Sequence, residues 1–310
     1  MPDLVTLGEA MAALTPDRIG PLRHTRRLDL SIAGSESTVA IGVRRLGHSA
    51  AWISRLGDDE LGRLIRLTLQ AEGVEVHAAD DREAPTGLML KERRTAGIRR
   101  VHYYRTRSAA SRLTPADLPP GLIESAKILH AGAITLALSH DAAATVAEAA
   151  RCARFVSFDA NYRGRLWSAD AFRDSVLKLL PSIDLLFASV DEARLLLCET
   201  DGPAPALAAA LRDGGPRTVV LTMGADGAVS ADHEGIHQVP AVKVTEVDPV
   251  GAGDSFVAGY LAALLSGTDA AARLRFASNV AAFSVAADGD WEGLPTAAEL
   301  ATGTTTDISR

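Results

Sequence analysis

A glycine-rich turn that leads into an apolar segment carries the strongest chemical signal in this sequence. Positions 247–256 read Val-Asp-Pro-Val-Gly-Ala-Gly-Asp-Ser-Phe. Because Gly251 and Gly253 lack side chains, their N–H groups can approach an anion, and the helix expected after them adds unpaired N–H groups and the positive end of its dipole. Gly251, Ala252 and Gly253 are therefore predicted to hold a phosphate group. A side chain at Gly253 is expected to crowd that group and to strain the backbone.

Asp254 follows this turn and lies in the first turn of the expected helix. A carboxylate is electrostatically favoured there, and it could accept the proton of a hydroxyl group during phosphoryl transfer. An ordinary glycine-rich helix start with an acidic cap remains an alternative. The sequence contains neither Gly-x-Gly-x-x-Gly nor Gly-x4-Gly-Lys, so a dehydrogenase and a P-loop enzyme are not favoured. We expect no metal site built from histidines.

Short apolar runs alternate with amphipathic stretches, which is typical of strand–helix units around a parallel sheet. The expected strands are 4–7, 51–54, 128–131, 155–158, 185–188 and 218–221. The expected helices are 36–46, 59–71, 141–151, 169–180, 190–197, 206–212, 251–266 and 270–287. Residues 219–230 indicate a strand, a turn and a strand. The predicted fold class is α/β, with a doubly wound, mainly parallel sheet.

Two polar segments, 15–32 and 85–107, interrupt this alternation. The second indicates a hairpin that turns near Ala96 and Gly97. We expect both segments to form a small β-sheet lid inserted into a single domain that spans residues 1–310.

The composition favours small-molecule partners. The 310 residues include 32 Lys and Arg against 39 Asp and Glu, a formal charge of −7, which argues against a nucleic-acid or membrane-surface partner. Acidic residues near the amino terminus do not fit a secretory signal, and the longest uncharged stretch is too short to span a bilayer. Cys152 and Cys198 are expected to be reduced core thiols of a cytoplasmic protein.

Two amino-terminal segments extend the pattern. Residues 33–40 read Ala-Gly-Ser-Glu-Ser-Thr-Val-Ala, and residues 55–62 read Arg-Leu-Gly-Asp-Asp-Glu-Leu-Gly. Together with Asp-x-x-Gly-Ala-Gly-Asp at 248–254, they resemble the signatures of the ribokinase-like (PfkB) sugar kinases. The matches extend over almost the whole chain.

This resemblance implies an ATP-dependent kinase that uses Mg²⁺, with Asp254 as the catalytic base. It also implies that Gly34 and Thr38 bind the sugar, although Ala33 and Thr38 stand where the family usually has glycine and asparagine. A monovalent cation such as K⁺ and a homo-oligomer, with dimerisation through the lid, are further expectations.

A basic and aromatic segment follows in the second insertion. If residues 101–111 form a strand, Tyr103, Arg105 and Arg107 share one face, so a sugar ring could pack on the tyrosine while an arginine pairs with a carboxylate. The alternative is an exposed sheet with ordinary cross-strand pairs.

A second basic segment, 157–167, follows an expected strand and contains Arg163. A capped, packed loop is its alternative interpretation. Both basic segments resemble 2-keto-3-deoxygluconate kinases, which implies that Arg105 and Arg163 bind the carboxylate of a sugar acid. Met89 stands where a tyrosine is common in those enzymes.

Nucleotide contacts are implied only by the family resemblance. Ser189 and Glu192 match the family's Asn-x-x-Glu, whose acid organises the Mg²⁺ shell through water, although Ser189 replaces the asparagine. The ATP-binding residues carried over from the family are Ser189, Thr222, Gly224, Gly227, Gly253 and Asn279.

The expected function is transfer of the ATP γ-phosphoryl group to a primary hydroxyl of a small sugar acid, 2-keto-3-deoxygluconate. A kinase for a neutral sugar such as fructose or ribose, or for a nucleoside, is the first alternative. A non-catalytic sugar or nucleotide sensor on the same fold is the second.

Overall fold

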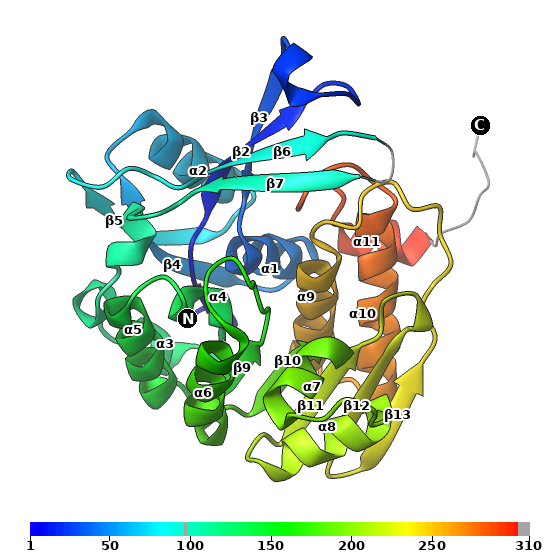
Figure 1. Ribbon diagram of the computed structural model, residues 1–310. Coiled ribbons are helices and arrows are strands. Elements are labelled where there is room, and N and C mark those ends of the chain that lie inside the picture. Colours follow the sequence, from blue (N-terminus) through cyan, green and yellow to red (C-terminus); the bar gives the residue numbers. More distant parts are fainter. Residues whose placement is uncertain (96–97, 303–310) are drawn as a thin grey trace.

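The computed structural model describes residues 1–95 and 98–302, and it contains two separate β-sheets (Figure 1). The larger sheet has nine strands in the order β13-β12-β11-β10-β9-β8-β1-β4-β5. They are β1 (Leu4–Leu7), β4 (Ala50–Gly57), β5 (Glu75–Asp81), β8 (Ile128–Gly132), β9 (Val156–Asp159), β10 (Leu185–Ser189), β11 (Thr218–Thr222), β12 (Ala228–Asp232) and β13 (Gly235–Val239). Neighbouring strands from β11 to β5 are parallel, and β12 and β13 continue the sheet in antiparallel pairing.

All six expected strands are present, and they form the middle of this sheet. Their side chains are buried on both faces, which is why they read as unbroken apolar runs. The marginal strands β5 and β13 were not expected from the sequence. They lie at the two edges of the sheet and carry exposed polar residues, so they lack the apolar run of a central strand.

Helices cover both faces of the large sheet and form one hydrophobic core on each side. One face is covered by α5 (His140–Cys152), α6 (Ala169–Leu179), α7 (Val190–Leu197) and α8 (Ala204–Asp213). The other face is covered by α1 (Ser35–Arg45), α2 (Glu60–Ala71), α9 (Ala252–Leu265) and α10 (Ala270–Val285). The short helices are α3 (Leu122–Ser125), α4 (Ala133–Leu136) and α11 (Ala297–Thr302). The doubly wound α/β prediction is therefore confirmed.

The smaller sheet, called the small sheet below, has four strands in the order β3-β2-β6-β7. They are β2 (Met11–Pro16), β3 (Leu28–Ala33), β6 (Leu88–Arg93) and β7 (Arg99–Tyr104). Figure 1 shows this sheet to one side of the large one, near the start of α9. The two polar segments therefore contribute to one sheet, although the first strand begins at Met11 rather than Thr15. Ala96 and Gly97, where the hairpin was expected to turn, lie outside the described residues.

Two further observations concern helices and thiols. None of the described helices combines the length and apolar character needed to cross a membrane. The expectation of two core thiols is wrong for Cys198, which is exposed, while Cys152 is half-buried. The reason is that α7 ends at Leu197, and Cys198 caps the helix in a left-handed conformation, with φ 54°.

Candidate active site

Gly251 and Gly253 differ in backbone conformation and in the space around them. Gly251 caps α9 with φ 79°, and a Cβ there would lie 2.1 Å from the carbonyl oxygen of Asp290. Gly253 lies inside the helix, outside the positive-φ region, and a Cβ there would meet nothing within 4 Å. The expected backbone strain at Gly253 is therefore wrong, because the constraint falls on Gly251. The open space beside Gly253 agrees with room for an anion.

Two cavities meet at this helix start. The small-sheet cavity, of about 690 Å³, lies against β7, the start of α1 and the loop after β9. The α9–α10 cavity, of about 610 Å³, lies against the end of β11, segment 241–249 and the two helices. Gly251 and Asp254 line the first cavity, and Ala252 and Gly253 line the second. The amino end of α9 therefore borders both cavities and lies where groups bound in the two would approach each other.

Asp254 is half-buried at this junction. Its Oδ1 accepts a hydrogen bond from the Ser35 hydroxyl at 2.5 Å, and the Asn161 side-chain amide donates to the same hydroxyl oxygen at 3.1 Å. Burial raises the pKa of the Asp254 carboxyl, while the Ser35 hydrogen bond and the positive charge of Arg163 oppose that rise. Ser35 was not recognised in the sequence, although it lies beside Gly34 in the amino-terminal motif.

Two other acids, Asp159 and Glu36, interact electrostatically with Asp254. Burial, followed by the charges of Glu192 and Asp254, raises the pKa of Asp159 well above its usual value. Burial is also the main cause that raises the pKa of Glu36 to about 7. The Glu36 carboxyl occupies space left by two glycines, because a Cβ at Gly8 would lie 2.2 Å from it and one at Gly132 would lie 3.0 Å from it. This part of the site therefore favours carboxyls that keep a proton near neutral pH.

The sugar-binding residues carried over from the family lie together. Gly34, Thr38, Tyr103, Arg105 and Arg163 all line the small-sheet cavity with Asp254. Thr38 is buried, and a Cβ at Gly34 would lie 2.5 Å from a backbone carbonyl oxygen, so only glycine fits there. The guanidinium carbon of Arg105 lies 5.8 Å from the centre of the Tyr103 ring.

Arg105 has a partner that the sequence did not reveal. Its guanidinium pairs with the buried carboxylate of Glu9, which also accepts a hydrogen bond from the Ser108 hydroxyl at 2.5 Å. The prediction that Arg107 shares a face with these residues is wrong, because β7 ends at Tyr104 and Arg107 takes φ 61° beyond it. Arg163 is exposed in the cavity and donates a hydrogen bond to the neighbouring Tyr162 carbonyl, at 3.3 Å.

The residues assigned to the nucleotide divide into two groups. Thr222, Gly224, Gly227 and Gly253 line the α9–α10 cavity. Asn279 is exposed on α10, and its neighbour Ser278 lines the cavity instead. Among the described residues, the lining of this cavity includes neither Ser189 nor Glu192 nor Asn279.

Ser189 and Glu192 form the cap of α7. The Glu192 carboxylate accepts hydrogen bonds from the Ser189 N–H at 2.7 Å, the Ser189 hydroxyl at 2.9 Å and the Tyr162 N–H at 2.6 Å. A carboxylate has roughly four lone-pair sites, so about one remains for a water molecule. The free lone-pair site of the Glu192 carboxylate therefore fits a contact to Mg²⁺ through a water molecule.

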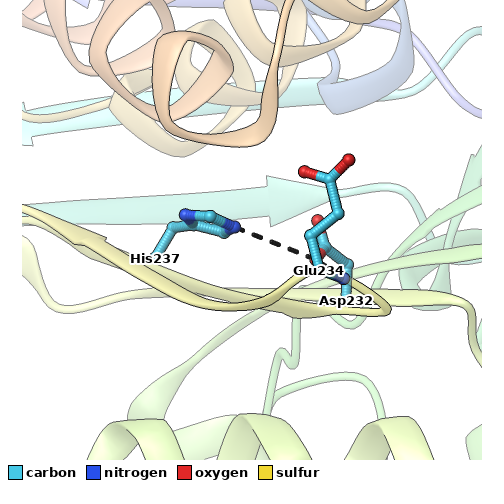
Figure 2. Close-up of side chains that lie close together, drawn as sticks. All are labelled: Asp232, Glu234 and His237. Atoms are coloured by element: carbon cyan, nitrogen blue, oxygen red, sulfur yellow. Dashed lines mark hydrogen bonds and ion pairs between the residues drawn. The ribbon is translucent and has the colours of Figure 1, made fainter.

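A separate hairpin brings together Asp232, Glu234 and His237, which could hold a metal ion. Figure 2 shows the His237 ring beside Asp232, and the His237 Nε2 lies 3.9 Å from Oδ1 of Asp232. Asp232 Oδ1 already accepts the N–H groups of Glu234 and Gly235, at 2.8 and 3.2 Å. These bonds close the turn between β12 and β13, so the group is explained by the hairpin itself.

Known proteins are similar to this chain over nearly its full length. A 2-dehydro-3-deoxygluconokinase of Thermoproteus tenax is 39% identical over 305 residues, covering 96% of this chain and 93% of that protein. A 2-dehydro-3-deoxygalactonokinase of Haloferax volcanii is 35% identical over 294 residues, covering 93% and 92%. The crystal structure of a PfkB protein from Polaromonas is 35% identical, covers 98% of this chain and 100% of that one, and superposes with a TM-score of 0.87.

The sequence profile of the pfkB carbohydrate kinases matches residues 1–297. That range contains the helix start at Gly251, both cavities and every residue placed around Asp254. The chain therefore belongs to the pfkB family of carbohydrate kinases.

Proposed function

We propose that this kinase transfers the γ-phosphoryl group of ATP to the primary hydroxyl of 2-keto-3-deoxygluconate, giving the 6-phosphate. The observation that carries the proposal is the meeting of the two cavities at the start of α9, with Asp254 on one side and Gly253 on the other. The sugar acid would occupy the small-sheet cavity and ATP the α9–α10 cavity. The names of the relatives from Thermoproteus tenax and Haloferax volcanii support a 2-keto-3-deoxy sugar acid as acceptor.

Each part of the site has a role in this reaction. Asp254 takes the proton of the attacking hydroxyl, and the N–H groups of the Gly251–Gly253 turn stabilise charge on the transferring group. The hydrogen bond from Ser35 orients the carboxylate toward the acceptor. Mg²⁺, when bound, would neutralise charge on the ATP phosphates, and Glu192 would hold one of its waters. The small sheet acts as a lid that excludes water from the site.

Arginine side chains support the choice of a sugar acid. Arg163 and Arg105 line the cavity in which the acceptor would lie. Because Arg105 already pairs with Glu9, its charge is largely neutralised, and Arg163 supplies more of the attraction for a substrate carboxylate. A neutral sugar would leave Arg163 without an anionic partner.

A panel of acceptors tests the proposal against its alternatives. Purified enzyme is given ATP and Mg²⁺, with and without K⁺, and 2-keto-3-deoxygluconate, its galactonate epimer, fructose, ribose or a nucleoside. The expected result is the highest kcat/KM with one of the two sugar acids. A preference for fructose or ribose would contradict the sugar-acid assignment, and binding without turnover of any acceptor would favour a sensor.

We propose further that two copies associate through the small sheet. Its edge strands β3 and β7 expose apolar side chains, with Leu30 52% and Tyr104 63% exposed. Light scattering should give a dimer for the wild type and a monomer for Leu30→Asp. The control Leu67→Asp changes a leucine of α2 that is 65% exposed, and it should leave the dimer intact. A monomeric wild type would contradict this proposal.

We also propose that the enzyme works in the cytoplasm. An exposed free thiol at Cys198 is typical of a reducing compartment, where ATP is available. Fractionation of the source cells tests this proposal.

A further inference from the structure

The segment 55–62 has no role in the proposed reaction, and it lies at the base of the small sheet. Gly57 ends β4, Asp59 caps α2, and Gly62 lies in the first turn of that helix. Thr86, two residues before β6, contacts this segment through its backbone and its side chain. The Asp59 carboxylate accepts the Thr86 N–H at 2.8 Å, and the Gly57 N–H donates to the Thr86 hydroxyl at 3.0 Å. Gly57, Asp59 and Gly62 are called the Thr86 socket below.

Both glycines of the socket are explained by close approach. A Cβ at Gly57 would lie 2.5 Å from the Thr86 nitrogen. A Cβ at Gly62 would lie 2.3 Å from the Gly57 carbonyl oxygen and 3.0 Å from the Thr86 hydroxyl oxygen. Neither glycine has a positive φ, so these positions require the missing side chain and not the backbone freedom of glycine. The socket therefore leaves room for one residue of a segment distant in the sequence.

Asp59 uses its two carboxylate oxygens for different contacts. Oδ1 accepts the Gly62 N–H at 2.8 Å and so caps α2, while Oδ2 accepts the Thr86 N–H. Burial raises the pKa of Asp59, but the N–H groups of Thr86 and Gly62 outweigh it and hold the pKa below its usual value. A helix cap needs only one side-chain oxygen. The contact to Thr86 is therefore the property to explain.

Three successive residues are fixed where the chain enters the small sheet. The Pro85 carbonyl accepts the Ala109 N–H at 2.8 Å, so the segments that enter and leave the β6–β7 hairpin meet there. Thr86 is held by the socket and is only 5% exposed. The Gly87 carbonyl accepts the Ala12 N–H of β2 at 2.9 Å. The socket is thus the contact that ties the base of the hairpin to β4 and α2.

The hairpin carries side chains of the acceptor cavity, whereas the socket does not. Met89 on β6, Tyr103 on β7 and Arg105 just after β7 line the small-sheet cavity. Within the described part of the chain, the lining of neither cavity includes Asp59 or Thr86. The socket can therefore affect the acceptor only through the position of the hairpin.

We propose that Asp59 and Thr86 are positioning residues for acceptor binding: the Thr86 socket fixes the base of the β6–β7 hairpin and so places the hairpin side chains that line the small-sheet cavity. The proposal rests on the proposed function, which puts the acceptor in that cavity. Neither residue touches the acceptor or ATP. The socket gives a role to a sequence motif that no step of the reaction uses.

Three variants of the full chain test this proposal. Asp59→Ser keeps a good helix cap, but its single short hydroxyl cannot serve α2 and Thr86 together. Thr86→Val breaks the contact from the other side, because it keeps the shape and the N–H but leaves the Gly57 N–H without its acceptor. Asp269→Ser is the matched control, since the exposed Asp269 caps α10 by accepting the Ala272 N–H at 2.7 Å.

The measurements are kcat and both KM values well below Tm, with the acceptor that the wild type converts fastest, and hydrogen exchange of residues 86–93. Small displacements far from the chemistry can lower rates by 10²-fold, so we expect kcat/KM for the acceptor to fall by about tenfold or more in Asp59→Ser and Thr86→Val, with KM for ATP within about twofold. ATP is spared because the described residues of the hairpin line no part of the α9–α10 cavity. Exchange of residues 86–93 should be faster in both variants. Asp269→Ser should match the wild type in kinetics and exchange.

Wild-type kcat/KM for the acceptor in both socket variants would overturn the proposal, because the contacts would then serve the fold only. An equal rise in the two KM values would overturn it as well, since the loss would not be confined to the acceptor. If one socket variant does not fold, the other decides. A wild type that phosphorylates no acceptor contradicts the proposed function instead, whereas unchanged hydrogen exchange of residues 86–93 contradicts the socket with any acceptor.

Discussion

Asp254 is a half-buried carboxylate that accepts a hydrogen bond from the Ser35 hydroxyl. Burial raises its pKa, which makes it a better proton acceptor than an exposed aspartate. The same burial makes the charge costly, so the helix start and Arg163 matter for keeping it ionised. The chemistry of the site therefore depends on a few neighbours of one residue.

Asp254→Asn tests the base directly. The amide keeps the size of the side chain and its acceptor for Ser35, but it cannot take the hydroxyl proton. We expect kcat to fall by roughly 10²- to 10⁴-fold, with little change in KM for ATP. Steady-state kinetics, with Tm as a control for folding, measure this. Retention of about a third of wild-type turnover with chemistry rate-limiting would show that Asp254 is not the base.

The two arginines of the small-sheet cavity are expected to differ. Arg163→Leu should lower kcat/KM for 2-keto-3-deoxygluconate by about 2 kcal/mol, roughly 30-fold, which is the low end for a charge pair because Arg163 is exposed. Turnover of fructose should change far less. Equal losses on both substrates would mean that Arg163 serves the structure or ATP.

Arg105→Leu should act on stability as well. It leaves the Glu9 carboxylate buried without its ion-pair partner, so the free energy of unfolding should fall by about 3 kcal/mol. Arg163→Leu should leave it within about 0.5 kcal/mol of the wild type, as is usual for exposed positions. Urea unfolding of the two variants measures the difference, and equal stabilities would contradict the importance of the Glu9 pair.

At the scale of elements, the start of α9 combines a constrained residue with an open one. Gly251 needs a positive φ and lies against a backbone carbonyl, whereas Gly253 is helical and faces open space. A methyl group is therefore expected to have opposite effects at the two positions.

Gly251→Ala and Gly253→Ala form a matched pair. Gly251→Ala should destabilise the fold, by about 1 to 3 kcal/mol from the left-handed backbone alone, and more from the contact with Asp290. Gly253→Ala should raise helix stability by up to about 1 kcal/mol, yet lower kcat by about tenfold or more because the methyl group crowds the phosphoryl group. A stable Gly253→Ala variant with wild-type kcat would remove the N–H cradle from the mechanism.

At the scale of the whole molecule, the buried acids make stability depend on pH. Glu36 has a pKa of about 7 in the folded protein, raised from 4.5, mainly by burial. The folded state therefore binds a proton that the unfolded state has lost, and stability falls as the pH rises from 4.5 to 7.

Glu36→Gln isolates this effect, because it keeps the shape of the side chain and removes the titration. Over that range the wild type should lose about 3 kcal/mol relative to the variant, and little more above pH 7. Chemical denaturation of both proteins at pH 5 and pH 8 gives the difference. Other titrating acids, including Asp159 and Asp254, remain in both proteins, so their direct contributions largely cancel. An unchanged difference between the two pH values would show that Glu36 stays ionised.

Local sequence patterns were sufficient for the architecture. The apolar runs 4–7 and 128–131 became central parallel strands, and the glycine turn at 251 became the cap of α9. Such patterns work because a strand buried on both faces, or a turn before a helix, is specified by residues that are neighbours in the chain. The polar edge strands β5 and β13 had no such run and were missed.

Tertiary structure decided the partners within the site. Three hydrogen-bonded pairs join residues far apart in the sequence. Their separations are 219 positions for Ser35 and Asp254, 199 positions for Lys91 and Asp290, and 99 positions for Glu9 and Ser108. Patterns among neighbouring residues cannot predict such contacts. The contacts form only when the strand ends, the small sheet and the start of α9 come together. The residue types that can do chemistry were therefore visible in the sequence, whereas their charge states and partners follow from burial in the folded molecule.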